Sequence, residues 1–215
     1  MGSATRSRHY PRSDMNTDRP PTPAERMALC STFIGDVDPW PFTESVGSSK
    51  QISDYLNAFD EFLEAVGIRY FNALEVSTPS SDSQQVAAKT GSNASIYNGQ
   101  FVLVYPVWLW VPMAAVVKLA DEVREALGGP ITCRNGIRPW WINQQVASSG
   151  IVSDHPMTAA VDLDLSKSGD LKAAHARAEE LYAAHASDLE ISMGQGDRVI
   201  HFGVHSPHGH RRWSY

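Results

Sequence analysis

Residues 153–165 read Ser-Asp-His-Pro-Met-Thr-Ala-Ala-Val-Asp-Leu-Asp-Leu, and the second half of this stretch alternates apolar and acidic side chains. Apolar residues at positions 161, 163 and 165 alternate with Asp162 and Asp164, a period that predicts a half-buried strand over residues 159–165. Successive strand side chains point to opposite faces, so we expect both carboxylates to leave the core on the same side. The loop that precedes this strand carries His155 and can fold back over it.

Patterns on both sides of this strand indicate helices and further strands. Apolar residues recur at helical spacing over residues 51–66, with Ser48 and Ser49 available as caps, over 112–127, where Gly128 ends the pattern, and over 171–185. Extended patterns occupy residues 101–110, 131–133, 189–193 and 198–204. Helices and strands in mixed order, with hairpin-like returns, predict an α+β fold with a mainly antiparallel sheet and flanking helices.

The N-terminal residues 1–27 differ from the rest of the chain, because they are rich in Arg and Pro and hold few apolar side chains. Such a segment cannot offset the entropy of ordering its own backbone, so we expect an extended arm. Its five arginines and three carboxylates give it a net charge of +2, which leaves −8 for residues 28–215 out of a total of −6. The expected partner of the arm is therefore an acidic surface on other protein subunits, including another copy of this protein. Residues 28–215 are expected to form the folded domain, with a long polar loop at 77–100.

Composition and charge restrict the classes of partner. Hydrophobic residues make up 42% of the chain and charged residues 20%, as in ordinary globular proteins. A net charge of −6 opposes general binding to nucleic acid, which requires an excess of Lys and Arg. The longest apolar run, residues 101–117, contains Pro106 and Pro112 and ends at Lys118, so no membrane span is expected. The N-terminus shows no apolar segment of the kind that signal peptides carry.

Three residues are candidate metal ligands. They are His155, Asp162 and His201, the last of which lies within the apolar strand pattern at 198–204. A catalytic zinc usually takes three protein ligands and leaves a fourth position for water. A loop histidine and a solvated carboxylate with no metal is the alternative interpretation of the same residues. Cys30 and Cys133 form no C-x-x-C pair and are expected to be buried thiols rather than ligands.

This arrangement resembles the zinc D-Ala-D-Ala carboxypeptidase family of murein peptidases, which has the hedgehog/DD-peptidase fold and includes phage endolysins. The family motif runs S-x-H-x-x-G-x-A-x-D and is followed by a strand histidine. The matching positions are Ser153, His155, Ala160 and Asp162. Thr158 stands in place of the motif's glycine, and Asn143 falls where the family often has an asparagine. Residues 129–138 resemble the family's upstream strand and turn, and residues 211–213 resemble its closing segment.

The resemblance implies a zinc-dependent peptidase that cleaves peptidoglycan stem peptides, as a carboxypeptidase or as a phage-type murein endopeptidase. The implied ligands of Zn²⁺ are His155, Asp162 and His201. Arg138 matches an arginine of the family, which would orient the substrate or stabilise the oxyanion, and capping of a turn is its alternative role. Trp140 and Trp141 follow it and, with Ser153, are the candidate substrate contacts, although tryptophans also serve as core residues.

The chain departs from the family at the general base. Peptide hydrolysis needs a carboxylate that takes a proton from water and delivers it to the leaving amine. The family commonly has that carboxylate three residues before the strand histidine, where this chain has Arg198, so Asp197 is the candidate base. Gly203 likewise replaces the aspartate of the family's H-x-D pattern. These departures favour a second hypothesis, a catalytically impaired DD-peptidase-like structural component of a phage virion.

Two further expectations concern location and the C-terminal histidines. Because no signal peptide is visible, an active peptidase would reach the cell wall on the virion or after lysis. The histidines at positions 205, 208 and 210 are expected to form a polar tail rather than to bind the metal.

Overall fold

The computed structural model describes residues 48–80, 84, 95–105, 107–136, 138, 154–157, 159–167, 169–206 and 209–215. The arm predicted at residues 1–27 lies outside the described residues, as does part of the predicted loop at 77–100. The helices are α2 (Ser49–Ala65), α3 (Ala73–Ser77), the 3₁₀ helix η1 (Val107–Leu109), α5 (Trp110–Leu127), α7 (Asp154–Met157) and α8 (Leu171–Leu189). The strands are β1 (Ser95–Tyr97), β2 (Gln100–Val102), β3 (Thr132–Asn135), β4 (Ala159–Asp164), β5 (Ser192–Gln195), β6 (Val199–Val204) and β7 (Arg211–Ser214).

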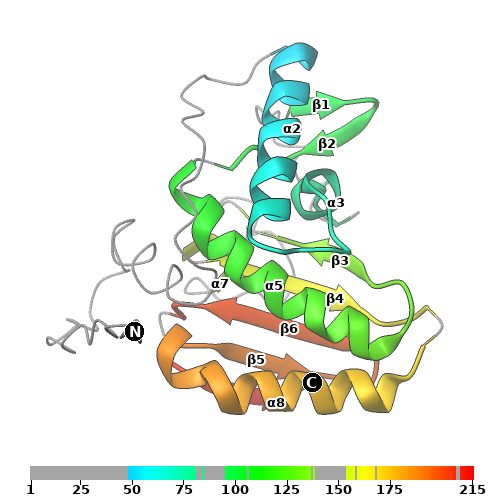
Figure 1. The fold of residues 1–215 in the computed structure, drawn as a ribbon, viewed down its shortest axis with the longest axis vertical. Coiled ribbons are helices and arrows are strands. Elements are labelled where there is room, and N and C mark those ends of the chain that lie inside the picture. The colour runs from blue at the N-terminus through cyan, green and yellow to red at the C-terminus, as the bar shows by residue number, and fades with distance from the viewer. Residues whose placement is uncertain are drawn as a thin grey trace, which may run out of the picture.

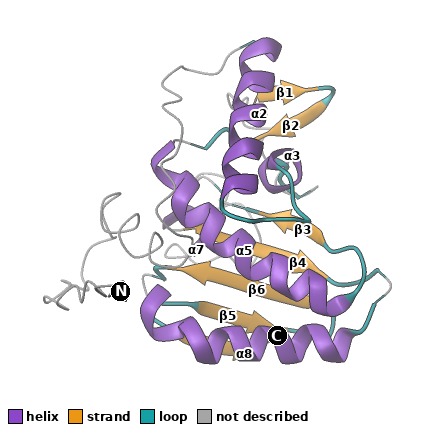
Figure 2. Cartoon of the chain, viewed as in Figure 1, coloured by secondary structure: helices purple, strands orange, loops and turns teal. Residues whose placement is uncertain are grey.

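Five strands form one sheet in the order β3-β4-β6-β5-β7 (Figure 1). Every neighbouring pair in this sheet is antiparallel except β5 and β7, which run parallel. Helices α5 and α8 contact each other and cross one face of the sheet, as Figure 2 shows with helices in purple and strands in orange. The predicted α+β fold, a mainly antiparallel sheet with helices against it, is confirmed.

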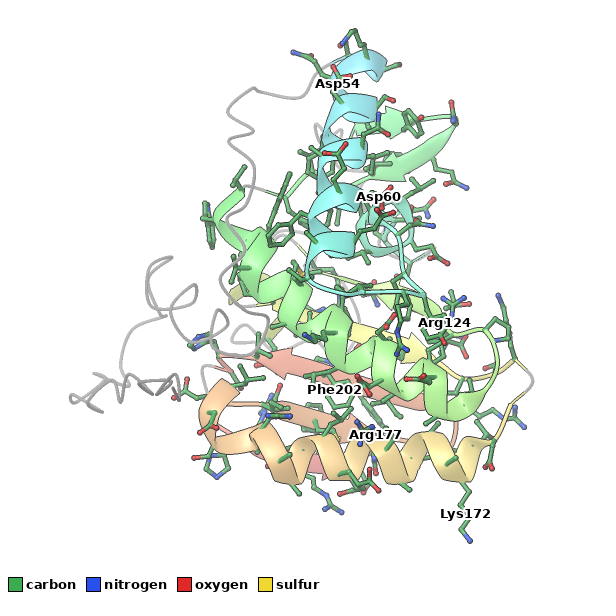
Figure 3. All side chains as sticks on the ribbon, in the orientation of Figure 1. Asp54, Asp60, Arg124, Lys172, Arg177 and Phe202 are labelled. Atoms are coloured by element: carbon green, nitrogen blue, oxygen red, sulfur yellow. The ribbon has the colours of Figure 1, made fainter. Side chains whose placement is uncertain are left out.

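The face of the sheet beneath α5 and α8 forms the main core. Val161 and Leu163 of β4 are fully buried there, and so are Ile200 and Phe202 of β6. Figure 3 shows Phe202 where the two helices cover the sheet. Burial of such side chains contributes about 1.5–3 kcal/mol each. Because strand side chains alternate, the residues between these apolar positions must project from the opposite face.

Helices α2 and α3 and the hairpin β1–β2 lie beyond the β3 edge of the sheet (Figure 1). Helix α2 begins with a capping box, in which Ser48 accepts from the main-chain N–H of Gln51 at 3.2 Å, and the Gln51 side chain accepts from that of Ser48 at 2.9 Å. Phe59 of α2 packs against Trp110 of α5, with ring centroids 5.0 Å apart. Gly128 ends α5 in the left-handed conformation, with φ 65, as the sequence predicts.

The strand predicted at 189–193 lies further along the chain, as β5, because α8 extends to Leu189. Three other stretches also differ from their sequence predictions. The polar loop predicted at 77–100 contains β1 and the start of β2, joined by a two-residue turn in which Asn98 and Gly99 have φ 49 and 79. Asn-Gly is the pair that such a turn favours. The strand predicted at 101–110 ends at Val102, and the chain then passes through η1 into α5. The polar-tail prediction is wrong at His205, because this residue is buried and β7 follows it.

Candidate metal centre

The register of the sheet lines up one residue from each strand in a row across the face opposite α5 and α8. Asp162 of β4 lies opposite His201 of β6, and the row continues through Gly194 of β5. Asn135 of β3 and Trp213 of β7 complete its two ends. Directly opposed strand residues have Cβ atoms about 4.5–5.5 Å apart, so strand pairing alone brings Asp162 and His201 together.

The three side chains predicted as metal ligands come together at this row. Asp162 uses one oxygen for each histidine: Oδ2 lies 3.1 Å from Nε2 of His155, and Oδ1 lies 2.8 Å from Nδ1 of His201. One ligand atom from each residue lies within 4.8 Å of the other two. Both histidines are buried and Asp162 is partly exposed, so solvent reaches the group beside the carboxylate.

His155 reaches the row from α7, a single turn immediately before β4. Its Nδ1–H donates to the carbonyl of Gly136 at 2.7 Å, since a carbonyl can only accept. That tautomer leaves the lone pair of Nε2 directed at Asp162, as a metal ligand requires. A Cβ at Gly136 would lie 2.5 Å from Oη of Tyr105 and 2.8 Å from the carbonyl oxygen of Val76. Glycine therefore lets this turn approach the core closely enough to present its carbonyl to His155.

His201 faces a second carboxylate on its other nitrogen. Nε2 of His201 lies 3.3 Å from Oδ2 of Asp154, a residue that is only 2% exposed. The same oxygen accepts a hydrogen bond from the hydroxyl of Ser192 at 2.7 Å, and Nη2 of Arg211 lies 3.5 Å from it. The sequence pattern assigns no role to Asp154, because an acidic residue beside a loop histidine carries no signal of burial.

Burial and pairing together set the protonation states of this group. Burial opposes ionisation of Asp162, but its electrostatic interactions with His155 and His201, together with the hydrogen bond to His201, outweigh it and hold the Asp162 pKa well below its usual value. Burial also opposes a charge on His201, yet hydrogen bonds to Asp154 and Asp162 raise its pKa to about 9. Burial lowers the pKa of His155. Without a metal, both ring nitrogens of His201 therefore carry a proton at neutral pH. A metal that binds His201 must displace one of these protons.

Arg138 lies at the same group, in contact with the candidate ligand Asp162. The side chain is buried, and its Nη2 lies 3.3 Å from Oδ2 of Asp162. Its main-chain N–H donates to the carbonyl of His155 at 3.2 Å. Nδ2 of Asn135 donates to the same oxygen of Asp162 at 3.0 Å. Arg138 is thus placed to neutralise and orient a ligand carboxylate, whereas its predicted contact with substrate stays a prediction.

A cavity of about 560 Å³ opens beside Asp162. Its lining residues are Arg134, Asn135, Asp162, Gly196, Asp197, Val199 and Tyr215. The predicted base, Asp197, is exposed and shares this cavity with the ligand Asp162. Arg134 is paired with Asp164 at 2.5 Å, so its charge is already balanced at the cavity edge. Asp197 is therefore a solvent-accessible carboxylate in the cavity that Asp162 also lines.

The predicted substrate contacts Ser153, Trp140 and Trp141 lie outside the described residues. A different tryptophan packs against the ligand group: the ring centroid of Trp213 lies 5.3 Å from that of His201. Sequence reasoning missed Asp154 and Ser192, and it selected Trp140 and Trp141 rather than Trp213 as the substrate contacts. Two glycines inside strands, Gly194 and Gly203, could have indicated these contacts from the sequence. Glycine in a strand often marks a position that other groups approach closely.

Comparisons with known proteins do not assign this group to a family. The chain matches no protein-family model, no curated protein and no solved structure. Among the described residues, no helix has the length and apolar character needed to cross a membrane. The chemistry of the site follows from its donor set, two imidazole nitrogens and one carboxylate oxygen, which suits a divalent transition metal such as Zn²⁺.

Proposed function

We propose that the protein is a zinc-dependent peptidase that cleaves the stem peptides of peptidoglycan, with the hedgehog/DD-peptidase-like fold that its sequence resemblance implies. The observation that supports this proposal is the convergence of His155, Asp162 and His201 within metal-ligand reach of one another. Three ligands of these types leave a fourth position open for water in catalytic zinc sites. The outer nitrogen of each histidine faces an oxygen, on Gly136 and on Asp154, as is common for zinc-bound histidines.

Zinc held by these residues would supply a water of lowered pKa and a Lewis acid for the peptide carbonyl. Asp197 is the proposed base, because it shares a cavity with Asp162 and is exposed to solvent. It takes a proton from the attacking water and passes it to the leaving amine. Arg138 holds the Asp162 carboxylate in place through their 3.3 Å contact and balances its charge.

A second candidate, a catalytically impaired structural component of a phage virion, is favoured by one observation. The residue three positions before His201 is Arg198, which is exposed and donates to the carbonyl of Ser166 at 3.4 Å. No carboxylate can act from that position. A protein of this kind keeps the fold, with or without the metal, but lacks the proton transfer. The arm at residues 1–27 would then dock on neighbouring subunits, as its charge predicts.

Elemental analysis and peptidoglycan digestion, performed on one preparation, separate these candidates. The proposed peptidase binds about one zinc per chain and releases peptide fragments that mass spectrometry detects. His155→Ala is expected to abolish both zinc binding and digestion. Asp197→Asn is expected to keep zinc and lose roughly 100-fold or more of the rate, the contribution of a general base. His210→Ala is the matched control, since His210 is exposed and outside the ligand group, and it should retain both properties.

Three other results would select the structural candidate or refute the proposal. Zinc without digestion by the wild-type protein would select the structural candidate. Zinc retained by His155→Ala but lost by His210→Ala would place the metal among the C-terminal histidines and refute the proposed site. A wild-type protein that takes up no zinc would refute the metallopeptidase.

A further inference from the structure

A second row of residues lies beside the ligand row and surrounds a buried carboxylate. Gly203 of β6 pairs with Ser192 of β5, which pairs in turn with Arg211 of β7. These residues lie two positions along their strands from the ligand row, so they project from the same face of the sheet. Asp154 of α7 packs onto this second row, where it contacts Ser192 and lies near Arg211.

Gly203 provides the space that Asp154 occupies. A Cβ at Gly203 would lie 3.0 Å from Cβ and 3.2 Å from Cγ of Asp154, and 2.6 Å from the hydroxyl of Ser192. The backbone of Gly203 is outside the left-handed region, so the glycine serves to leave room rather than to allow an unusual φ. Through this space the carboxylate of Asp154 comes within 3.3 Å of Nε2 of His201.

The surroundings of the Asp154 carboxylate make it a hydrogen-bond acceptor. The hydroxyl of Ser192 donates to Oδ2 at 2.7 Å, and the guanidinium of Arg211 lies 3.5 Å away. Nε2 of His201 is buried and lies 3.3 Å from Oδ2 of Asp154. A buried N–H in that situation strongly favours an acceptor at close range, and Asp154 is placed to be that acceptor.

We propose that Asp154 is a positioning residue for the metal: its carboxylate accepts the Nε2–H of His201 and thereby fixes the tautomer whose Nδ1 binds the ion. Without this acceptor, His201 can carry its proton on either nitrogen, and its ring is no longer held against Asp162. The inference rests on the metal-binding part of the proposed function and not on peptidase activity. Outer partners of metal-bound histidines typically change metal affinity by roughly 10- to 100-fold.

Zinc affinity, measured by competition with a chromophoric chelator, tests this role in Asp154→Asn and Asp154→Ala. The matched control is Asp164→Asn, which removes the same charge from the ligand-bearing face of β4 but touches Arg134 instead of His201. Asp154→Ala removes the acceptor and should bind zinc roughly 10- to 100-fold more weakly than wild type, whereas Asp154→Asn keeps an amide oxygen that can accept the Nε2–H and should bind closer to wild type. The control should remain within about threefold, because its ion-pair partner Arg134 is largely exposed to solvent, where ion pairs have little influence. Equal affinities for Asp154→Ala and Asp164→Asn would overturn the proposal.

A second measurement keeps the proposal testable if the Asp154 variants do not fold, which circular dichroism reports. Nitrogen NMR of the His201 imidazole in the zinc-loaded wild-type protein identifies the nitrogen that binds the metal. Zinc at Nδ1 with a proton on Nε2 is the expected result, and zinc at Nε2 would overturn the proposal. Zinc binding without peptidoglycan digestion would refute the peptidase and leave the role of Asp154 standing. A wild-type protein that binds no zinc would refute both.

Discussion

Replacement of Gly194 by alanine is expected to drive the indole of Trp213 away from the ligand group. A Cβ at Gly194 would lie 2.5 Å from Cε2, 2.6 Å from Cζ2 and 2.8 Å from Nε1 of Trp213. Carbon atoms normally pack about 3.5–4.0 Å apart, so the ring must move. Gly194 is outside the left-handed backbone region, and backbone strain therefore does not contribute to the effect.

The size of the effect follows from what the indole contacts. The centroid of its ring lies 5.3 Å from the ring centroid of His201 and 4.8 Å from Cζ of the Arg211 guanidinium. Overpacking costs about 1–3 kcal/mol, and alanine offsets about 0.4–1 kcal/mol by reducing the freedom of the unfolded chain. Gly194→Ala should therefore lower the free energy of unfolding by about 1–2 kcal/mol. For a chain of this size, that corresponds to a decrease in Tm of about 2–8 °C.

Urea unfolding of the single and double variants, in the presence of a chelator, measures this effect. In a Trp213→Ala background the clash is absent, so Gly194→Ala should be neutral or stabilising by up to about 1 kcal/mol. Gly196→Ala is the control, because its Cβ would meet Tyr215 at an ordinary 3.4 Å. If Gly194→Ala costs the same with and without Trp213, within about 0.5 kcal/mol, the close approach of the indole is not the cause and the reasoning fails.

Three other predictions follow from buried or strained positions. The folded-state pKa of His201 is raised to about 9 from 6.5, so the metal-free protein should lose stability as the pH rises from about 6.5 to about 9. The midpoint of urea unfolding, measured across this pH range, tests this prediction. A midpoint of the wild-type protein that does not change with pH would contradict it. His201→Gln should remove that dependence. Burial raises the pKa of Cys133 to about 12, so in a Cys30→Ser background its thiol should resist alkylation at about pH 8 until the protein unfolds; rapid labelling of the native protein would contradict this. Gly99→Ala should destabilise the protein by about 1 kcal/mol in urea unfolding because φ is 79, whereas Gly99→Asn should cost less; equal costs would argue against a backbone origin.

Much of the fold could be predicted because the signals lie between near neighbours. Helix α2 follows from the helical spacing of its apolar residues, and the end of α5 follows from Gly128. The hairpin β1–β2 was also within reach, since Asn98 and Gly99 carry its turn, but the polar composition around them favoured a loop. Strand β7 was not predictable as a strand, because four residues at a sheet edge depend on parallel pairing with β5.

The three candidate ligands could be predicted from the sequence, but the residues that hold them in place could not. His155, Asp162 and His201 belong to a spaced motif, and the alternation of β4 places Asp162 outside the core. Asp154 is a neighbour of His155 in sequence, yet nothing local separates a buried acidic residue from a solvated one. Its partner Ser192 lies 38 residues away along the chain. Burial of this kind is a property of the assembled sheet.

By itself, the sequence determined the long helices α2, α5 and α8, the inward and outward faces of β4 and the three candidate ligands, because periodicity and motif spacing are properties of short segments. Only the tertiary structure decided the strand register, which sets Asp162 against His201 across 39 residues of chain. It also decided that Gly203 leaves room for Asp154 and that Gly194 lies beneath Trp213. These contacts depend on which strands pair and at which offset, and a slip of one residue would turn every side chain to the other face.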